Sequence, residues 1–149
     1  MRDKVNEIKV SYCEKLGVIE SQPMTDSGQV ARLLYDNWDR NTIGLKETFK
    51  VLLLNNANKV KGTYQASTGG IVGTVVDVRL LFAVVLKTAS VGIIFSHNHP
   101  AGTLKPSEAD KQQKEKIRNA ADFFDIRVLD HLIIAPNGKY FSFSDNGLL

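Results

Sequence analysis

Cysteine is almost absent from this chain, which has one cysteine and three histidines among its 149 residues. The single Cys13 cannot close an intramolecular disulfide, and a zinc site built from several thiolates is excluded. A lone cysteine is also typical of a protein in a reducing compartment. Any metal site must therefore be built from histidine and carboxylate ligands.

Long apolar runs and flexible linkers are missing as well. No apolar run approaches the roughly 20 residues that a membrane-spanning helix needs. The N-terminal MRDKVNEIKV lacks the continuous apolar core of a signal peptide. No internal repeat and no segment rich in proline, glycine and serine divides the chain. We therefore expect a soluble, cytoplasmic protein without membrane contact, folded as a single domain over residues 1–149.

Neither sign of charge is in large excess. The chain has 19 lysine and arginine residues against 16 aspartate and glutamate residues, a formal net charge of +3. A mixed surface of this kind permits nucleic-acid binding but does not imply it. Composition indicates nothing about the oligomeric state.

Apolar periodicity predicts strands and helices that interleave without the regularity of a doubly wound fold. Strands are predicted at residues 5–12, in a hairpin over 47–67, at 91–96, and in a pair over 126–144 that turns at Asn137-Gly138. Helices are predicted within residues 25–38, 77–89 and 107–124, the first capped by Asp26 or Ser27 and the second by Asp77. The apolar run VGIIFS at 91–96 is typical of a central strand. The predicted fold class is α/β, with helices packed on a mixed α+β sheet.

Two of the three histidines, His97 and His99, stand one residue apart where this central strand ends. Residues two apart in an extended chain point to the same side, so both imidazoles can reach one point while Asn98 faces the other way. The chain then turns, and the following helix carries Asp110 in its first turn. Two imidazoles and one carboxylate, with a fourth position left to water, match the ligand count of a catalytic zinc site. Such an ion brings the pKa of its bound water to about 7.

Glu47 is the candidate for a proton acceptor outside this ligand set. It stands at the start of a strand whose hydrophobic residues place that strand inside the sheet. A metal-bound water benefits from a carboxylate that takes its proton and passes it to a leaving amine. The plainer interpretation of Glu47 is a solvated charge at a strand end.

The helix start also has a purely structural interpretation. The segment from Ser107 to Asp110 has the form of a capping box, in which both side chains satisfy free backbone amides. An H-x-H pair is likewise a weak signal when it stands alone. The joint pattern H-x-H-x7-S-x-x-D, however, is expected by chance in on the order of one chain in several thousand. Chance is therefore the poorer explanation of the combination.

These residues resemble the motif of the JAMM (MPN+/JAB) metalloproteases. Within that superfamily, the segment SHNHPAGTLKPSEAD is similar to the RadC-like branch. The resemblance covers about residues 25 to 144. It implies a cytidine-deaminase-like MPN/JAB domain, in agreement with the mixed sheet flanked by helices that the apolar pattern predicts.

The resemblance also implies a role for each residue of the motif. His97, His99 and Asp110 would ligate zinc. Glu47 would be the general base and proton shuttle. Ser107 would stabilise the oxyanion of the tetrahedral intermediate.

Some features of the resembling family are absent. RadC-like proteins often carry an N-terminal helix-hairpin-helix module associated with DNA binding, whereas residues 1–24 are too few to form one and are expected to be an N-terminal extension. The insertions with which eukaryotic relatives grip ubiquitin are not found. His131, the third histidine, lies in an apolar strand and is predicted to be structural, because three protein ligands already suffice for a catalytic zinc site.

The leading hypothesis is a zinc-dependent metallohydrolase of the JAMM type. It would cleave a peptide, isopeptide or related amide bond of a peptide or protein substrate through a metal-activated water. The alternative is a non-catalytic binding module of DNA repair or replication that retains the metal to hold its fold. A metal-dependent nuclease fits less well, because phosphodiester chemistry commonly uses paired metals. Histidine and carboxylate ligands also suit iron or manganese.

Overall fold

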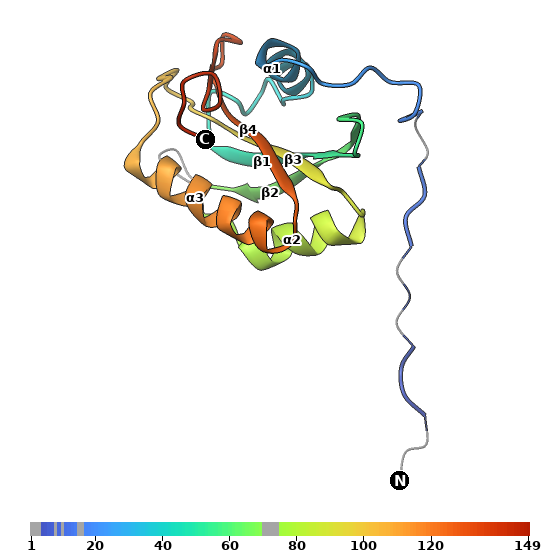
Figure 1. Ribbon diagram of the computed structural model, residues 1–149. Coiled ribbons are helices and arrows are strands. Elements are labelled where there is room, and N and C mark those ends of the chain that lie inside the picture. The colour runs from blue at the N-terminus through green and yellow to red at the C-terminus, as the bar shows by residue number, and fades with distance from the viewer. Residues whose placement is uncertain (1–3, 8, 10, 15–16, 70–74) are drawn as a thin grey trace.

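The computed structural model describes residues 4–7, 9, 11–14, 17–69 and 75–149. Its centre is a five-stranded mixed sheet with the strand order β2-β1-β3-β4-β5 (Figure 1). The strands are β1 (Thr48–Leu54), β2 (Val60–Thr68), β3 (Gly92–Asn98), β4 (Arg127–Ile134) and β5 (Tyr140–Ser142). The helices are α1 (Ser27–Asp36), α2 (Val78–Lys87) and α3 (Glu108–Phe123). The predicted fold class, a mixed sheet flanked by helices, is confirmed.

Helices cover both faces of the sheet, with α1 on one face and α2 and α3 on the other (Figure 1). The core on the α2 and α3 face includes Phe49, Val51, Phe95, Leu81, Val85 and Ile117. The core on the α1 face includes Leu52, Ile94, Leu132, Val30 and Leu34. Since successive strand residues point to opposite faces, a strand between two cores is apolar on both faces where it crosses them, as Ile93, Ile94 and Phe95 are. All seven residues of β3 are buried, as the run VGIIFS predicted.

Strand register brings distant segments of the chain to one edge of the sheet. β3 pairs antiparallel with β1, so that Phe49 lies opposite His97. It pairs parallel with β4, so that Phe95 lies opposite His131, and α3 forms the crossover between these two strands. The start of β1 and the end of β3 therefore lie next to each other.

Capping residues define where the helices begin. The Asp26 side chain accepts a hydrogen bond from the Gln29 amide at 2.9 Å, and α1 starts at the next residue. Asp77 caps α2 by accepting from the amides of Arg79 and Leu80. The predictions for these two helix starts are confirmed, with Asp26 rather than Ser27 as the first cap.

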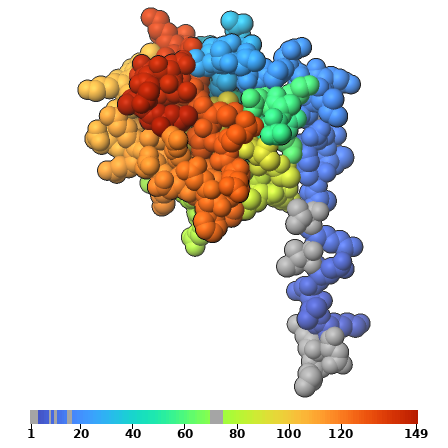
Figure 2. Space-filling model, in the orientation of Figure 1, coloured from blue at the N-terminus to red at the C-terminus, as the bar shows by residue number. Residues whose placement is uncertain are grey.

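The predicted strand at residues 5–12 is wrong for the part of it that the structure describes. Residues 5–7, 9, 11 and 12 belong to no strand, and each of them is exposed. Alternating apolar residues form a half-buried strand only where a neighbouring strand and a core receive them. The described residues of this segment project from the body of the molecule instead (Figure 2).

The C-terminal residues pack beside α1; Figure 2 shows them in red next to the blue of the α1 region. The Ser27 hydroxyl donates to the Asp145 carboxylate and lies 3.1 Å from the Tyr140 hydroxyl. Within the described ranges, none of the helices has the length and apolar character that crossing a lipid bilayer demands.

Candidate metal centre

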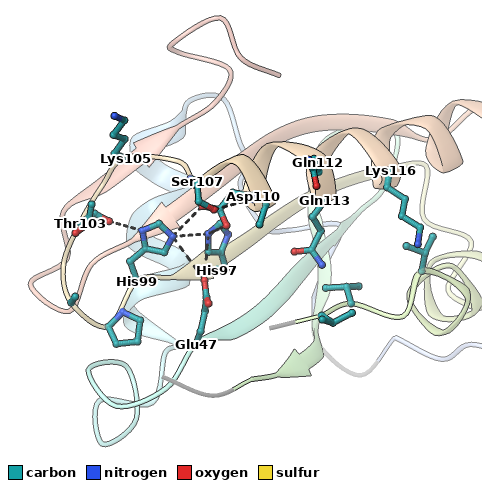
Figure 3. A pocket seen from close by; sticks show the side chains of 16 residues that line it. Glu47, His97, His99, Thr103, Lys105, Ser107, Asp110, Gln112, Gln113 and Lys116 are labelled. Carbon is teal, nitrogen blue, oxygen red and sulfur yellow. Dashed lines mark hydrogen bonds and ion pairs between the residues drawn. The ribbon is translucent and has the colours of Figure 1, made fainter. Parts of the chain in front are cut away.

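Four ionisable side chains from separate parts of the chain converge at one edge of the sheet: Glu47, His97, His99 and Asp110 (Figure 3). One potential ligand atom of each lies within 4.8 Å of the others. The side chains are 9%, 3%, 16% and 12% exposed, respectively. This group could hold a metal ion. It brings together the three residues predicted to bind a metal and the one predicted to act as a base.

The capping box brings Asp110 to the two histidines. The Ser107 amide donates to Asp110 Oδ2 at 2.8 Å, and the Asp110 amide donates to Ser107 Oγ at 3.0 Å. These reciprocal bonds start α3 and fix the Asp110 side chain at its first turn. The structural interpretation of this segment is therefore correct, and it is compatible with a carboxylate that faces both imidazoles.

The Nε2 atoms of His97 and His99 and the Asp110 carboxylate form a triangle whose spacing is close to that of ligands around a tetrahedral ion. Nε2 of His97 lies 3.0 Å from Nε2 of His99. Asp110 Oδ1 lies 3.2 Å from the first of these nitrogens, and Oδ2 lies 3.2 Å from the second. Zinc–ligand bonds of about 2.0–2.2 Å place neighbouring tetrahedral ligands roughly 3.3–3.5 Å apart. Small adjustments of these side chains would suffice to hold an ion of this kind.

Glu47 lies just outside this triangle of atoms. Its Oε1 is 3.7 Å from His97 Nε2 and 3.9 Å from His99 Nε2. Burial raises the pKa of Glu47; the two imidazoles oppose this effect and the Asp110 carboxylate reinforces it. The Gly69 amide donates to the Glu47 carbonyl at 2.8 Å and so fixes its backbone. A buried carboxylate with a raised pKa, close to the triangle, is suited to accept and return a proton.

Opposing effects act on the other two charged groups of the cluster. Burial disfavours the Asp110 carboxylate, but hydrogen bonds from the imidazoles of His97 and His99 hold its pKa well below its usual range. Burial likewise lowers the pKa of His99, yet its hydrogen bonds to Asp110 and to the Thr103 carbonyl, with the charges of both carboxylates, produce a net rise. Two carboxylates beside two imidazoles make this a place that favours a cation.

Both imidazoles are oriented through their Nδ1 atoms. His99 Nδ1 lies 2.6 Å from the Thr103 carbonyl oxygen. His97 Nδ1 lies 2.8 Å from Nε2 of His131, a fully buried residue of β4. Burial, and then the nearby His97, lower the pKa of His131 well below its usual value, which favours the neutral ring. His131 lies outside the cluster of four potential ligands.

Asn98, between the two histidines, points to the opposite face of the sheet, as the alternation of an extended chain predicts. Its Oδ1 accepts a hydrogen bond from the Thr48 amide at 2.7 Å. Its Nδ2 donates to the carbonyls of Ile43 at 2.7 Å and Lys46 at 2.9 Å. Asn98 therefore fixes the loop that leads into Glu47.

A groove of about 580 Å³ opens over the cluster and includes Ser107 in its lining. Three valines line one part of it: Val75, Val76 and Val78. Polar side chains of α3 line another part: Gln112, Gln113 and Lys116 (Figure 3). The groove thus combines an apolar wall with a wall of amides and a lysine ammonium, beside the ionisable cluster.

Sequence reasoning misses three supports of this site. Asn98 was expected only to face away, the Thr103 carbonyl has no side-chain signal, and His131 was expected only to be structural. The support by His131 follows from the parallel pairing of β3 with β4, which places this residue two positions before Ile133, the register partner of His97.

Comparisons with known proteins agree with the motif. The family model of the RadC-like JAB domain matches residues 24–148. A UPF0758 protein of Flavobacterium johnsoniae is 53% identical over 102 residues, which cover 68% of this chain and 44% of the relative. A UPF0758 protein of Porphyromonas gingivalis is 43% identical over 104 residues, or 70% of this chain and 46% of the relative. The UPF0758 protein YeeS of Escherichia coli is 40% identical over 110 residues, or 73% and 74% of the two chains. The chain spans about half the length of the first two relatives.

Proposed function

Since this chain belongs to the RadC-like JAB domain family, we propose that it is a zinc-dependent hydrolase that cleaves a peptide, isopeptide or related amide bond. One observation carries the proposal. The Nε2 atoms of His97 and His99 and the carboxylate of Asp110 lie 3.0–3.2 Å apart, with the Glu47 carboxylate 3.7–3.9 Å from both nitrogens. The Glu47 carboxylate lies farther from both nitrogens than the Asp110 carboxylate does, as expected for a base outside a ligand set of three residues.

His97, His99 and Asp110 would hold the zinc ion, through two neutral nitrogens and one carboxylate oxygen. The donor set fits, because the two nitrogens lie 3.0 Å apart and each lies 3.2 Å from one oxygen of the Asp110 carboxylate, close to the spacing of tetrahedral ligands. When bound, zinc acidifies a coordinated water and polarises the carbonyl of the bond to be cleaved.

Glu47 would move the proton that amide hydrolysis requires. Its Oε1 would accept a proton from the attacking water and donate it to the leaving amine nitrogen. Because burial raises the pKa of this carboxyl group, it binds a proton more readily than an exposed glutamate does. Its position before the first residue of β1 and the hydrogen bond from the Gly69 amide to its carbonyl limit its motion.

The Ser107 hydroxyl would stabilise the oxyanion of the tetrahedral intermediate. A serine hydroxyl has one hydrogen to donate and two lone pairs to accept. The Asp110 amide uses one lone pair of Ser107 Oγ, so the hydroxyl hydrogen remains for a substrate oxygen in the groove. Capping and oxyanion stabilisation are therefore compatible in one residue.

The groove would receive the chain of a peptide or protein substrate. Side-chain amides and the Lys116 ammonium on α3 offer hydrogen bonds to a peptide backbone, and the three valines of the lining offer contact with apolar side chains. A non-catalytic module for DNA repair or replication remains the rival, and it predicts nucleic-acid binding that is independent of Glu47.

The test is Glu47→Gln, which keeps the shape of the side chain but removes its proton affinity. We expect the zinc-loaded variant to retain the metal in elemental analysis and to lose about 10²- to 10⁴-fold in cleavage of a proteome-derived peptide library read by mass spectrometry. His97→Ala, the matched control, is expected to lose both zinc and cleavage. A Glu47→Gln protein that cleaves as fast as the wild type would overturn the proposed mechanism.

A further inference from the structure

His131 has an environment that suits phenylalanine better than histidine. Its ring is fully buried, stacks on Phe143 at 4.3 Å between centroids and lies 4.5 Å from Phe95. Its Nδ1 is buried and has no hydrogen-bond partner in the part of the chain that the structure describes. Few buried polar atoms in native proteins lack a partner, because each one lowers stability. The imidazole must therefore owe its presence to its other nitrogen.

That other nitrogen, His131 Nε2, lies 2.8 Å from His97 Nδ1. A neutral imidazole carries its proton on one nitrogen and a lone pair on the other. For His97 to offer the lone pair of Nε2 to a cation, its proton must be on Nδ1, where it needs an acceptor. A neutral His131 supplies that acceptor at Nε2 and then carries its own proton on the unpaired Nδ1.

The two clustered histidines are thus oriented by different means. His99 Nδ1 faces the Thr103 carbonyl, which can only accept, so the tautomer of His99 is fixed by the backbone. His97 Nδ1 faces another imidazole, which can donate or accept, so its tautomer depends on that partner. Partners of this kind tune metal affinity even though they never touch the metal.

Three hydrogen bonds to Asp130 fix the strand around His131. Its carboxylate accepts from the His131 amide at 2.7 Å, from the Ser142 hydroxyl at 2.6 Å and from the Ser144 amide at 3.0 Å. These bonds join β4 to β5 and the residues after it, and so hold Phe143 over the imidazole. The backbone of His131 and the Phe143 ring that stacks on its imidazole are therefore both fixed, and with them the position of His131 Nε2.

We propose that His131 is a positioning residue that selects the metal-binding tautomer of His97 and fixes the direction of its ring. This inference rests on the proposed function, in which His97 binds a metal. It explains why a neutral ring with one unpaired nitrogen occupies an aromatic site.

The test compares His131→Phe, which keeps an aromatic ring but has no acceptor, with His131→Gln, whose amide oxygen can reach the position of Nε2. We expect His131→Phe to weaken Zn²⁺ binding about 10- to 100-fold in competition with a chromophoric chelator. The visible absorption of bound Co²⁺ should change as well. His131→Gln should restore both within a few-fold. Phe82→Leu, the control, alters the packing of a buried aromatic ring that contacts Phe124, away from the cluster, and should leave both unchanged.

If His131 acted only through the stability of the fold, Zn²⁺ affinity would follow the thermal stability of the variants. The metal-free His131→Phe protein should unfold at the same or a higher temperature than His131→Gln, because it has no unpaired polar atom. A purely structural role therefore predicts that His131→Phe binds Zn²⁺ at least as tightly as His131→Gln. If the larger ring prevents folding, His131→Val removes the acceptor in a smaller side chain. Equal Zn²⁺ affinity of the wild type and the Phe or Val variant would overturn the inference alone, as would equal losses in His131→Phe and His131→Gln. A wild-type protein that binds neither ion would overturn the proposed function too.

Discussion

The Asp110 carboxylate accepts a hydrogen bond from the Ser107 amide at 2.8 Å and at the same time lies 3.2 Å from each of two imidazole nitrogens. One group therefore starts α3 and completes the candidate metal centre. Capping and ligation are distinct demands on this side chain, because capping needs only an acceptor atom, whereas a cation gains from the full negative charge.

Asp110→Asn should separate these two demands. The amide oxygen of asparagine can still accept from the Ser107 amide, but the negative charge is lost. We expect the variant to keep the helical content of the wild type by circular dichroism and to bind Zn²⁺ at least about 100-fold more weakly, more than the change expected for a residue outside the ligand set. Unchanged Zn²⁺ affinity would mean that Asp110 serves the helix only.

Ser107→Ala tests the other half of the capping box. The Asp110 amide would lose its acceptor, and we expect the free energy of unfolding to fall by about 0.5–2 kcal/mol. The free energy of unfolding of Ser107→Thr, which keeps the hydroxyl, should fall much less. Urea denaturation of the metal-free proteins measures both. Equal stability of the alanine variant and the wild type would show that the cap contributes nothing.

Asn98 should be important for stability although it binds nothing in the groove. Asn98→Ala leaves the Thr48 amide and the carbonyls of Ile43 and Lys46 without their buried partner. We expect a loss of about 1–3 kcal/mol in the free energy of unfolding. Asn98→Asp keeps the acceptor and loses both donors, so it should also destabilise the protein. Urea denaturation measures the free energy of unfolding of both variants. Values equal to that of the wild type would contradict this role.

Asp77 should make the stability of α2 depend on pH. Hydrogen bonding from the Leu80 amide, with smaller help from Arg79, lowers its pKa in spite of some desolvation. A carboxylate with a lowered pKa in the folded state stabilises the fold above its unfolded pKa of about 4. This contribution is lost as the pH falls through the lower folded value. The Tm of Asp77→Ala should therefore be lower than that of the wild type at pH 7, and the two Tm values should converge near pH 2. A difference in Tm that stays constant with pH would show that the charge of Asp77 does not contribute to stability.

Zinc itself should stabilise the folded chain, because it binds the folded state. At a free concentration 100 times its Kd, a ligand adds about 2.7 kcal/mol to the free energy of unfolding. We expect a higher Tm of the wild type with Zn²⁺, reversed by a chelator, and no such shift for His97→Ala. An equal shift in both proteins would place the ion elsewhere.

Much of this fold was predictable because its signals are local. The apolar run of β3, the acidic cap of α2 and the Asn137-Gly138 turn each depend on neighbours within a few positions. The strand predicted at residues 5–12 failed for the opposite reason. Its alternation is local, but a strand also needs a neighbour to pair with, and the described residues there have none.

The candidate site divides in the same way. Its two histidines and its aspartate follow one another closely, so their spacing alone predicts that they meet. The support by His131 depends on which strand pairs with β3 and in which register, and no local pattern contains that information. The hydrogen bond of His99 to Thr103 goes to a backbone carbonyl, which looks the same in every residue type.

The last two residues of β3 serve opposite faces of the sheet, His97 in the cluster and Asn98 in the loop before β1. A change of backbone conformation in residues 43–46 would weaken the hydrogen bonds of Asn98 to the carbonyls of Ile43 and Lys46. Because His97 precedes Asn98 directly, the same change would also alter the position of the His97 ring in the groove. A saturation mutagenesis map of this protein would therefore score that loop as sensitive, although residues 43–46 are not among those that line the groove.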